Sequence, residues 1–459
     1  MMTYMPTLLQ LTLLFTLLTA CSDEATSPSG QNESSQSNTS VNQASSTHVA
    51  SSSSQASSSD SNTLAPELIP ESPWTFLSLN PSTHYGTRHF NVPASQHWVN
   101  TGLFLSRGES VTITAEGTWS MDGNEYITAQ GKAGDKEFRG CTLGSLVARI
   151  GLFYEDTEIT CVGTQAEFVA PKDGIVFLGA ILSTDLGETY EDRRNADGEV
   201  RVSLTSNIGR VVPTIPVANT QTYDYSVVSS DWVEIMGTYN VLTLPTDIAN
   251  SDKETLIRAV NRLDAMYQLQ AEFRGLQPYN GQPIRWMGDT EDAPGWMLAG
   301  SPVRLDPSII DGDISVRITH AGETYNDTWG YAHELGHIFN FAGGDWYYTS
   351  FGGLEAWPNI FALYTVEKLN LPVNDALSSC TERKANYLAD VKTPFNDDPW
   401  VGMCFFKSLR EQHGWGMFKQ FYAEFNKNPG FGWKFLRDRF SRSANSDLNP
   451  IFDEWQLPQ

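Results

Sequence analysis

The candidate catalytic residues form a His-Glu-x-x-His motif that runs from His333 to His337. On a helix, His333 and His337 project from the same face about one turn apart. Two neutral imidazoles at this spacing can hold one Zn²⁺ and leave further coordination positions open. Glu334 lies about 100° round the helix from His333. It is therefore expected beside the metal, where a general base for a metal-bound water is needed.

The alternative is a chance match on a solvated helix face. The flanking residues argue against it, because they are mostly apolar and make a helix that packs into a core: Trp329, Tyr331, Ala332, Leu335, Ile338 and Phe339. Buried His and Glu side chains need polar partners. Gly336 inside the helix costs roughly 1 kcal/mol relative to Ala, which indicates close packing at that point. The motif therefore favours a zinc peptidase.

Length and charge limit the other function classes. A chain of 459 residues predicts two or three domains, each able to bury a core. The formal net charge of −24 argues against nucleic acid as a partner, because its phosphates would be repelled. We expect an exported, monomeric protein.

The five cysteines divide into one isolated residue and two local couples. Cys21 stands apart near the N-terminus. Cys141 and Cys161 lie in one predicted domain, and Cys380 and Cys404 lie in another. In an exported protein this pattern predicts two disulfides. Four buried free thiols are the alternative.

Residues 1–20 have the composition of a targeting segment. The apolar run from Leu8 to Leu18 is shorter than the roughly 20 residues that span a bilayer. It ends in Leu-Thr-Ala before Cys21 and resembles a bacterial lipoprotein signal, although no Lys or Arg precedes it. The resemblance implies a lipid anchor at Cys21 in a bacterial cell envelope. Because Ser22 rather than an acidic residue follows, the outer membrane or cell surface is expected.

Residues 21–72 are mostly Ser, Asn, Gln and Thr and show no apolar periodicity. Such a segment cannot bury a core, so we expect a disordered, Ser-rich tether. Residues 73–207 differ, because short stretches alternate apolar and polar side chains between turn residues. Examples are 111–115, 166–170 and 200–204. This pattern predicts a β-sandwich.

Several blocks of this region resemble the bacterial galactose-binding lectin of the PA-I type: residues 100–105, 117–119, 140–141, 144–151 and 168–175. The resemblance implies a sugar site with Ca²⁺ held by a late loop. In the matching loop, Asp185 and Asn195 fall on the family's positions, and Asp197 offers a further oxygen ligand. Ala196 replaces the second Asn of the family's pair. The alternative is an acidic, solvated loop on a lectin-like sandwich that serves as a spacer.

Residues 208–459 are predicted to form an α-rich α+β metallopeptidase domain, which begins with a linker over about 208–230. A helix is expected from Ser251 or Asp252 onward, with either residue as its cap. The alternating residues 314–319 predict a strand, whose edge could bind an extended substrate backbone. Thr324 to Asp327 then supplies a cap for the motif helix.

A catalytic zinc usually has three protein ligands, so the motif needs one more. We favour Glu355 over Asp345 and Glu367. Pro358 is tolerated only in the first turn of a helix, which places Glu355 at or just before the start of a second helix. Asn359 would then lie near enough to bond a ligand imidazole.

The second half of the chain resembles the enhancin-like, mucin-degrading metallopeptidases (peptidase family M 60, gluzincin class). The resemblance rests on the motif and on four further blocks in the same order, at 293–302, 354–364, 399–405 and 414–419. The resemblance covers about half of the chain and implies cleavage of O-glycosylated, mucin-like proteins. A donor for the tetrahedral oxyanion is also required. The candidates are Tyr331, Tyr347, Tyr348 and His413.

Two alternatives stay open. One is a glycan-binding surface adhesin with a peptidase-like domain that does not cleave. The other is a general peptidase that is indifferent to glycans.

Overall fold

The computed structural model describes residues 85–96, 98–134, 137–138, 140–151, 159–181, 195–288, 296–300, 302–310, 318–324, 326–341, 353–371, 379–389, 398–428, 430 and 432–458. These residues belong to one compact unit, Pro73–Gln459. The predicted signal peptide, the lipidation site Cys21 and the tether lie outside the described residues. Among the described helices, none is both long and apolar enough to cross a membrane.

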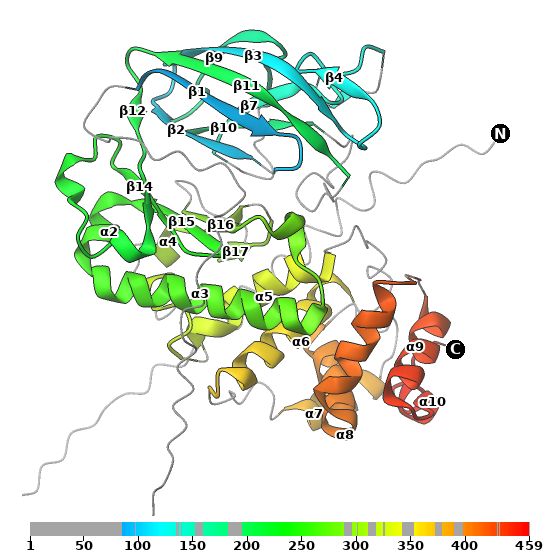
Figure 1. The fold of residues 1–459 in the computed structure, drawn as a ribbon. Helices are drawn as coiled ribbons and strands as arrows, with labels where there is room; N and C mark the ends of the chain where they lie inside the picture. The colour runs from blue at the N-terminus through cyan, green and yellow to red at the C-terminus, as the bar shows by residue number, and fades with distance from the viewer. Residues whose placement is uncertain are drawn as a thin grey trace, which may run out of the picture. The chain divides into compact units, whose positions relative to one another are not determined.

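The first half of the described chain is built mainly from two five-stranded antiparallel sheets (Figure 1). The first sheet has the order β1 (Gly86–Pro93), β11 (Asp197–Ser206), β3 (Ser110–Ser120) and β4 (Tyr126–Thr128), and β9 (Gln165–Val169) also pairs with β3. Along β11, apolar residues are buried and the polar residues between them are mostly exposed. The alternation predicted from the sequence is therefore confirmed, and one face of this sheet is solvated.

The second sheet has the order β12 (Arg210–Val211), β2 (Val99–Leu105), β10 (Gly174–Ala180), β7 (Leu146–Ile150) and β8 (Thr160–Cys161). Strands β2 and β7 are buried at every position. One face contributes to the sandwich core, and the other packs in a cluster with Trp232 and Met287 of the next sheet. This sheet is therefore covered on both faces, which explains its nearly continuous apolar sequence.

The boundary after the sandwich differs from the prediction. Val211 of β12 pairs with Leu103, so the sandwich extends beyond residue 207. Strand β13 (Thr214–Pro216) already belongs to the next sheet, and the 3-10 helices η2 (Val217–Asn219) and η3 (Tyr225–Val227) follow it. The linker predicted over 208–230 was therefore wrong. Pro216 is compatible with a strand because β13 is an edge strand, where a missing N–H breaks no ladder bond.

The second half of the chain is mainly helical and begins with a six-stranded mixed sheet. Its order is β13, β14 (Trp232–Met236), β15 (Asn240–Pro245), β16 (Ile284–Gly288), β18 (Val303–Leu305) and β17 (Met297–Leu298). Strand β17 pairs antiparallel with β18 and ends the sheet as described. The short helices α2 (Thr246–Ser251) and α4 (Pro307–Ile310) flank these strands.

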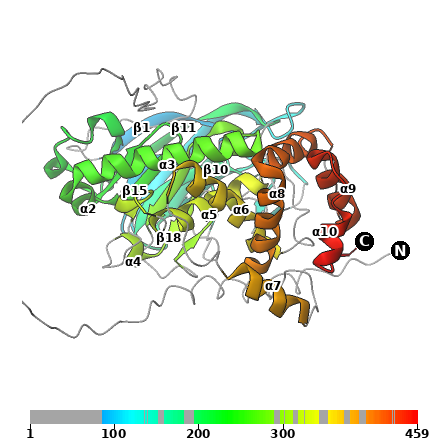
Figure 2. The same cartoon turned by 90° about the horizontal axis from the view of Figure 1, so that it is seen from below.

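The long helices α3 (Lys253–Arg274), α5 (Asn326–Phe341) and α6 (Gly353–Lys368) lie side by side, and each contacts the other two (Figures 1 and 2). They share one apolar core with α8 (Pro399–Phe425), α9 (Trp433–Ala444) and α10 (Asn449–Glu454). Helix α8 is kinked at Gly414, whose φ is 69°. The motif helix α5 therefore lies inside the domain rather than on its surface.

Local sequence signals set the start of α3 as predicted. Asp252 is its N-cap, and its Oδ1 accepts a hydrogen bond of 3.0 Å from the N–H of Thr255. Ser251, the other candidate, ends the preceding helix α2. Helix α3 stops where Gly275 adopts a left-handed conformation, with φ of 68°.

The strand predicted over 314–319 does not form at its described end. Residues 311–317 lie outside the described residues, and Ile318–His320 forms the 3-10 helix η5. The N–H of Ala321 donates to the carbonyl of Ile318 at 3.2 Å, so the chain turns here toward α5. Turn hydrogen bonds therefore replace the ladder bonds that the alternating pattern predicted.

Both predicted cysteine couples are disulfides in the structure. Cys141–Cys161 connects β6 (Cys141–Thr142) with β8, and Cys380–Cys404 connects α7 (Cys380–Ala389) with α8. Each bridge therefore links neighbouring elements of one half of the described chain.

Candidate metal centre

The helix that carries the motif begins at the predicted cap. The hydroxyl of Thr324 accepts a 3.3 Å hydrogen bond from the N–H of Asp327 and donates to the carboxylate of Asp327 at 2.6 Å. Beyond this cap, the apolar residues of α5 are buried: Tyr331, Ala332, Leu335, Ile338 and Phe339. The solvated-face alternative is therefore wrong, and the motif residues lie on a helix held on several sides.

Gly336 allows α5 and α6 to approach closely, as its position in the helix predicted. A Cβ at Gly336 would lie 2.8 Å from the carbonyl oxygen of Pro358 and 2.9 Å from its Cα. Any side chain at this point would push the two helices apart. The helix propensity lost at Gly336 therefore allows close contact with the helix that carries Glu355.

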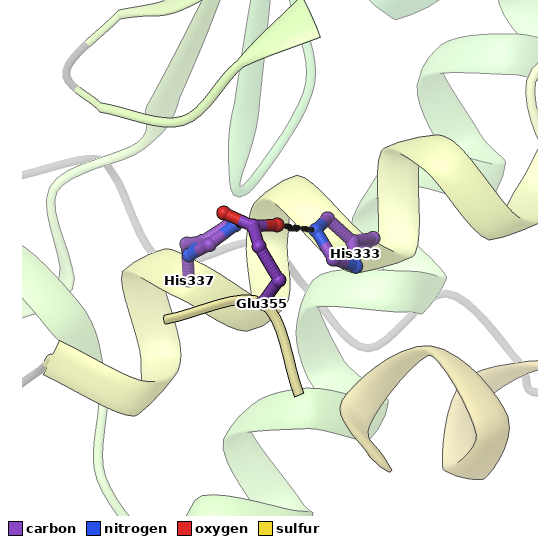
Figure 3. A group of neighbouring side chains, drawn as sticks. All are labelled: His333, His337 and Glu355. Carbon is purple, nitrogen blue, oxygen red and sulfur yellow. Dashed lines mark hydrogen bonds and ion pairs between the residues drawn. The ribbon is translucent and has the colours of Figure 1, made fainter. Parts of the chain in front are cut away.

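Three side-chain atoms from these helices converge on one point (Figure 3). The Nε2 atom of His333 lies 2.9 Å from Oε2 of Glu355, and the Nε2 atom of His337 lies 3.3 Å from the same oxygen. The two Nε2 atoms are 3.2 Å apart. Of the residues that the structure describes, only these three form such a cluster of possible metal ligands.

These separations fit a metal ion. Ligand atoms about 2.0–2.1 Å from a tetrahedral Zn²⁺ lie roughly 3.3 Å from one another. The three measured separations are close to that length. The cluster also offers two imidazole nitrogens and a carboxylate oxygen, which is a ligand set found in catalytic zinc sites.

Asn359 sets the orientation of one imidazole. Its Oδ1 lies 2.8 Å from Nδ1 of His333. Because an amide oxygen only accepts hydrogen bonds, Nδ1 carries the proton and Nε2 keeps its lone pair for a metal. Glu355 and Asn359 are four residues apart on α6 and share one of its faces.

Glu355 and the imidazoles perturb one another's ionisation. Burial opposes protonation of His333, but the hydrogen bond and charge of Glu355 outweigh it and raise the pKa of His333 to about 9. Burial also opposes ionisation of Glu355, yet the charges and hydrogen bonds of His337 and His333 hold its pKa well below the usual range. Without a metal, the cluster therefore retains a proton that a bound cation would displace.

Glu334 lies beside the ligand cluster and against the sheet edge. It is 8% exposed, and this burial raises the pKa of its carboxylate. The backbone of Ala299, directly after β17, donates a hydrogen bond to Glu334. A Cβ on Gly330 would collide with Cε of Met297, so α5 also packs closely on β17. A backbone donor such as Ala299 leaves no signal in the sequence, so this contact could not be predicted.

The start of α6 differs in detail from the prediction. The helix begins at Gly353, so Glu355 lies within its first turn and Pro358 lies further inside. The prediction that Pro358 belongs to the first turn was wrong. Its ring removes the N–H that would bond the carbonyl of Leu354, and the surrounding packing tolerates this loss.

The competing third ligand Glu367 belongs to another network. Its carboxylate accepts hydrogen bonds from Nε1 of Trp415, at 2.9 Å, and from Arg410. Asp345, the other competitor, lies outside the described residues.

Of the four candidate donors to the oxyanion, Tyr331 is excluded by its position in the structure. Tyr331 is fully buried, with its ring 5.7 Å from that of Trp286, and burial raises its pKa well above the usual value. It therefore belongs to the core. His413 precedes the kink in α8 and remains a candidate with Tyr347 and Tyr348, which lie outside the described residues.

The expected calcium loop gains no support from the described residues. Asp185 lies outside them. Asn195 is exposed in a turn, and Asp197 accepts a hydrogen bond from the hydroxyl of Tyr126, which lowers the pKa of Asp197. Among the described residues, neither Asn195 nor Asp197 belongs to a cluster of possible metal ligands.

Residues 223–456, just over half of the chain, match the family described as peptidase M60, enhancin and enhancin-like. The chain belongs to this family. The resemblance inferred from the ordered sequence blocks is confirmed, and with it a metallopeptidase fold for the second half of the chain.

A curated relative from Bos taurus is TRPM8 channel-associated factor 2, which is 29% identical over 244 residues, covering 50% of this chain and 25% of that protein. The mouse protein of the same name is 24% identical over 386 residues, covering 79% of this chain and 38% of its own length. The chain spans only about a quarter to two fifths of the length of such relatives.

Two solved metallopeptidases share the fold. The catalytic module of the metalloprotease ZmpA from Clostridium perfringens is 13% identical with a TM-score of 0.51, over 82% of this chain and 77% of that one. IMPa from Pseudomonas aeruginosa, in complex with an O-glycopeptide, is 14% identical with a TM-score of 0.50, over 83% of this chain and 50% of that one. At this identity the likeness shows the fold alone.

Proposed function

We propose that this protein is a zinc endopeptidase that cleaves O-glycosylated, mucin-like proteins with Glu334 as general base. The observation that carries the proposal is the convergence of His333 Nε2, His337 Nε2 and Glu355 Oε2 beside the buried Glu334 carboxylate. Two imidazoles and one carboxylate suit a zinc that keeps a position open for water or substrate.

The chain's own residues supply the rest of the chemistry. When bound, Zn²⁺ would polarise the scissile carbonyl and lower the pKa of its water to about 7. His333, His337 and Glu355 would hold it, and Asn359 orients His333. Glu334 accepts the proton of the attacking water and passes it to the leaving amine. Its burial favours this role, because a raised pKa makes a carboxylate a better proton acceptor.

The edge of β17 is the proposed binding strand for the peptide. In the sheet as described, β17 is the last strand, and the residue after it bonds Glu334. A substrate chain in extended conformation can hydrogen-bond along such an edge. The scissile bond of the substrate would then lie beside the Glu334 carboxylate.

The substrate class and location are extensions of this proposal. IMPa, which shares the fold, was solved with an O-glycopeptide, which supports glycosylated peptide as the substrate here. We also propose, from the sequence alone, that the protein is monomeric and carries a lipid anchor at Cys21. This anchor would place it on the outer membrane or cell surface. A substrate-holding role for the lectin-like sandwich is also proposed on the resemblance alone.

Zinc analysis and digestion of an O-glycoprotein by wild type and Glu334→Ala test the proposal. We expect zinc in both proteins and cleavage only by wild type. Equal cleavage by both, or no cleavage by either with zinc absent, would contradict it. Zinc-loaded protein that binds glycans without cleaving would favour the adhesin alternative. Equal cleavage of the deglycosylated substrate would favour the general peptidase.

A further inference from the structure

We propose that Gln270 is a positioning residue that sets the relative placement of the two helices bearing the metal ligands. This inference rests on the proposed zinc site. Gln270 lies on α3 and is fully buried. Its Nε2 donates hydrogen bonds to the carbonyl of Ala332 at 2.7 Å and to the hydroxyl of Thr365 at 3.2 Å.

The two acceptors belong to the two ligand helices. Ala332 directly precedes His333 on α5, and Thr365 lies on α6 with Glu355 and Asn359. One side-chain nitrogen therefore bridges the helices that supply all three proposed ligands.

The hydrogen-bond directions at this bridge are determined by chemistry. The Thr365 hydroxyl donates its own proton to the carbonyl of Phe361 at 2.8 Å, so it must accept from Gln270. The Ala332 carbonyl can only accept. Both N–H bonds of the Gln270 amide are therefore used.

Gln270 is poorly suited to a packing role. Its Oε1 is buried and has no hydrogen-bond partner among the described residues. An apolar residue of similar size would avoid burying this oxygen, which is unfavourable without a partner. The amide at this position therefore matters for its two donors.

A second donor of α3 supports the other end of the motif. Arg274, one turn after Gln270, donates from Nε to the carbonyl of Phe339 at 3.1 Å. Ala332 and Phe339 lie on either side of the segment from His333 to His337. Helix α3 thus holds α5 before and after its ligands, while Gly336 and Pro358 hold α5 against α6. Gln270 reaches both ligand helices through one side-chain nitrogen.

The test uses the full-length protein with Gln270→Met, which keeps the length of the side chain but removes both donors. Leu256→Ala on the same helix is the matched control, because Leu256 is fully buried and is not part of this bridge. The measurements are zinc affinity by chelator competition, the visible spectrum of the Co²⁺-substituted protein, and kcat and KM.

We expect Gln270→Met to weaken zinc binding about tenfold, the lower end of the range for residues that orient ligands indirectly. The Co²⁺ bands should shift and kcat should fall with little change in KM. Leu256→Ala should keep the wild-type Co²⁺ spectrum and zinc affinity even if its Tm falls as far as that of Gln270→Met. A folded Gln270→Met protein with wild-type zinc affinity and Co²⁺ spectrum would overturn the inference.

Thr365→Val removes one of the two bonds and keeps the test decisive if Gln270→Met does not fold. It should shift the Co²⁺ bands in the same direction by a smaller amount, and an unchanged spectrum would overturn the inference. A wild-type protein that binds no zinc would instead defeat the proposed function itself, so the two failures are distinguishable.

Discussion

Two buried carboxylates in the second half of the chain differ in how their charge is balanced. Glu234 on β14 is fully buried and pairs with Arg285 of β16. Its oxygens also accept hydrogen bonds from Thr243 at 2.9 Å and Thr214 at 3.0 Å. This carboxylate has its counter-charge and its hydrogen-bond donors within the chain.

Glu355 faces His333 and His337, whose charge depends on a bound proton, unlike the permanent charge of an Arg. Its Oε2 faces two imidazole nitrogens, one of which is already oriented by Asn359 to keep a lone pair. Groups that all offer electron pairs are stable together only if a proton or a metal ion lies between them. A buried carboxylate that pairs with an Arg has its charge balanced within the chain, whereas one that faces imidazole lone pairs is suited to bind a metal ion.

The largest effect is expected when the carboxylate of the ligand cluster is neutralised. Glu355→Gln keeps the shape but removes the anionic ligand. We expect zinc affinity to fall by at least about 100-fold, because loss of a ligand should cost more than loss of a residue that only supports a ligand. Cleavage should fall to background. Zinc titration and an O-glycoprotein digest measure this. Tight zinc binding by the variant would mean that Glu355 is not a ligand.

Neutralising the other carboxylate should have the opposite signature. Glu234→Gln leaves the Arg285 guanidinium buried without its anion. We expect a loss of about 3–5 kcal/mol in the free energy of unfolding. Burial already lowers the pKa of Arg285 to about 9, which shows how strongly the site opposes an unpaired charge. Denaturant unfolding measures the change, and the folded fraction should still bind zinc normally. A large loss of zinc affinity in this variant would remove the distinction between the two sites.

A smaller effect is expected from the residue that orients His333. Asn359→Ala removes the acceptor at Nδ1 and frees the ring to change tautomer and orientation. Zinc affinity should fall about 10- to 100-fold, as it does when other hydrogen-bond partners of metal ligands are removed. Asn359→Asp, which keeps an acceptor at this position, is the control and should retain tight binding. Equal affinities for Asn359→Ala and wild type would show that the imidazole is held by packing alone.

The last predicted effect, at most about tenfold for each pH unit, is a pH dependence of metal binding. The pKa of His333 in the metal-free protein is raised from 6.5 to about 9. The Glu355 interaction therefore stabilises the metal-free protein fully below pH 6.5 and less as the pH rises to about 9. Zinc must displace this proton, so its affinity should rise across the same window by up to about tenfold per pH unit. Titrations at several pH values, in buffers of different ionisation enthalpy, measure the released proton. A flat profile from pH 6.5 to 9 would contradict a proton shared by His333 and Glu355.

The sequence predicts those parts of the site that depend on short spacing. His333, Glu334 and His337 lie on one helical turn, and Glu355 and Asn359 lie on one turn of the next helix. Helical geometry alone brings the members of each group together. The caps at Thr324 and Asp252 are equally local, and the structure confirms both.

Features made by tertiary packing were missed or misjudged. Gln270 precedes the motif by more than 60 residues, and a glutamine in a helix usually indicates a solvated position. The hydrogen bond from Ala299 comes from the backbone and is independent of residue type. Pro358 lies deeper in its helix than its ring chemistry favours, and it packs there against Gly336 of the motif helix.

The zinc content of the purified protein shows whether the cluster of His333, His337 and Glu355 binds a metal ion. Metal analysis of wild type and His337→Ala, each dialysed against buffer with trace zinc, compares the complete cluster with one that lacks a ligand. We expect one zinc per wild-type chain and a large loss in the variant, because two remaining ligands hold the ion weakly. Wild-type protein without zinc, or equal zinc in both proteins, would contradict it.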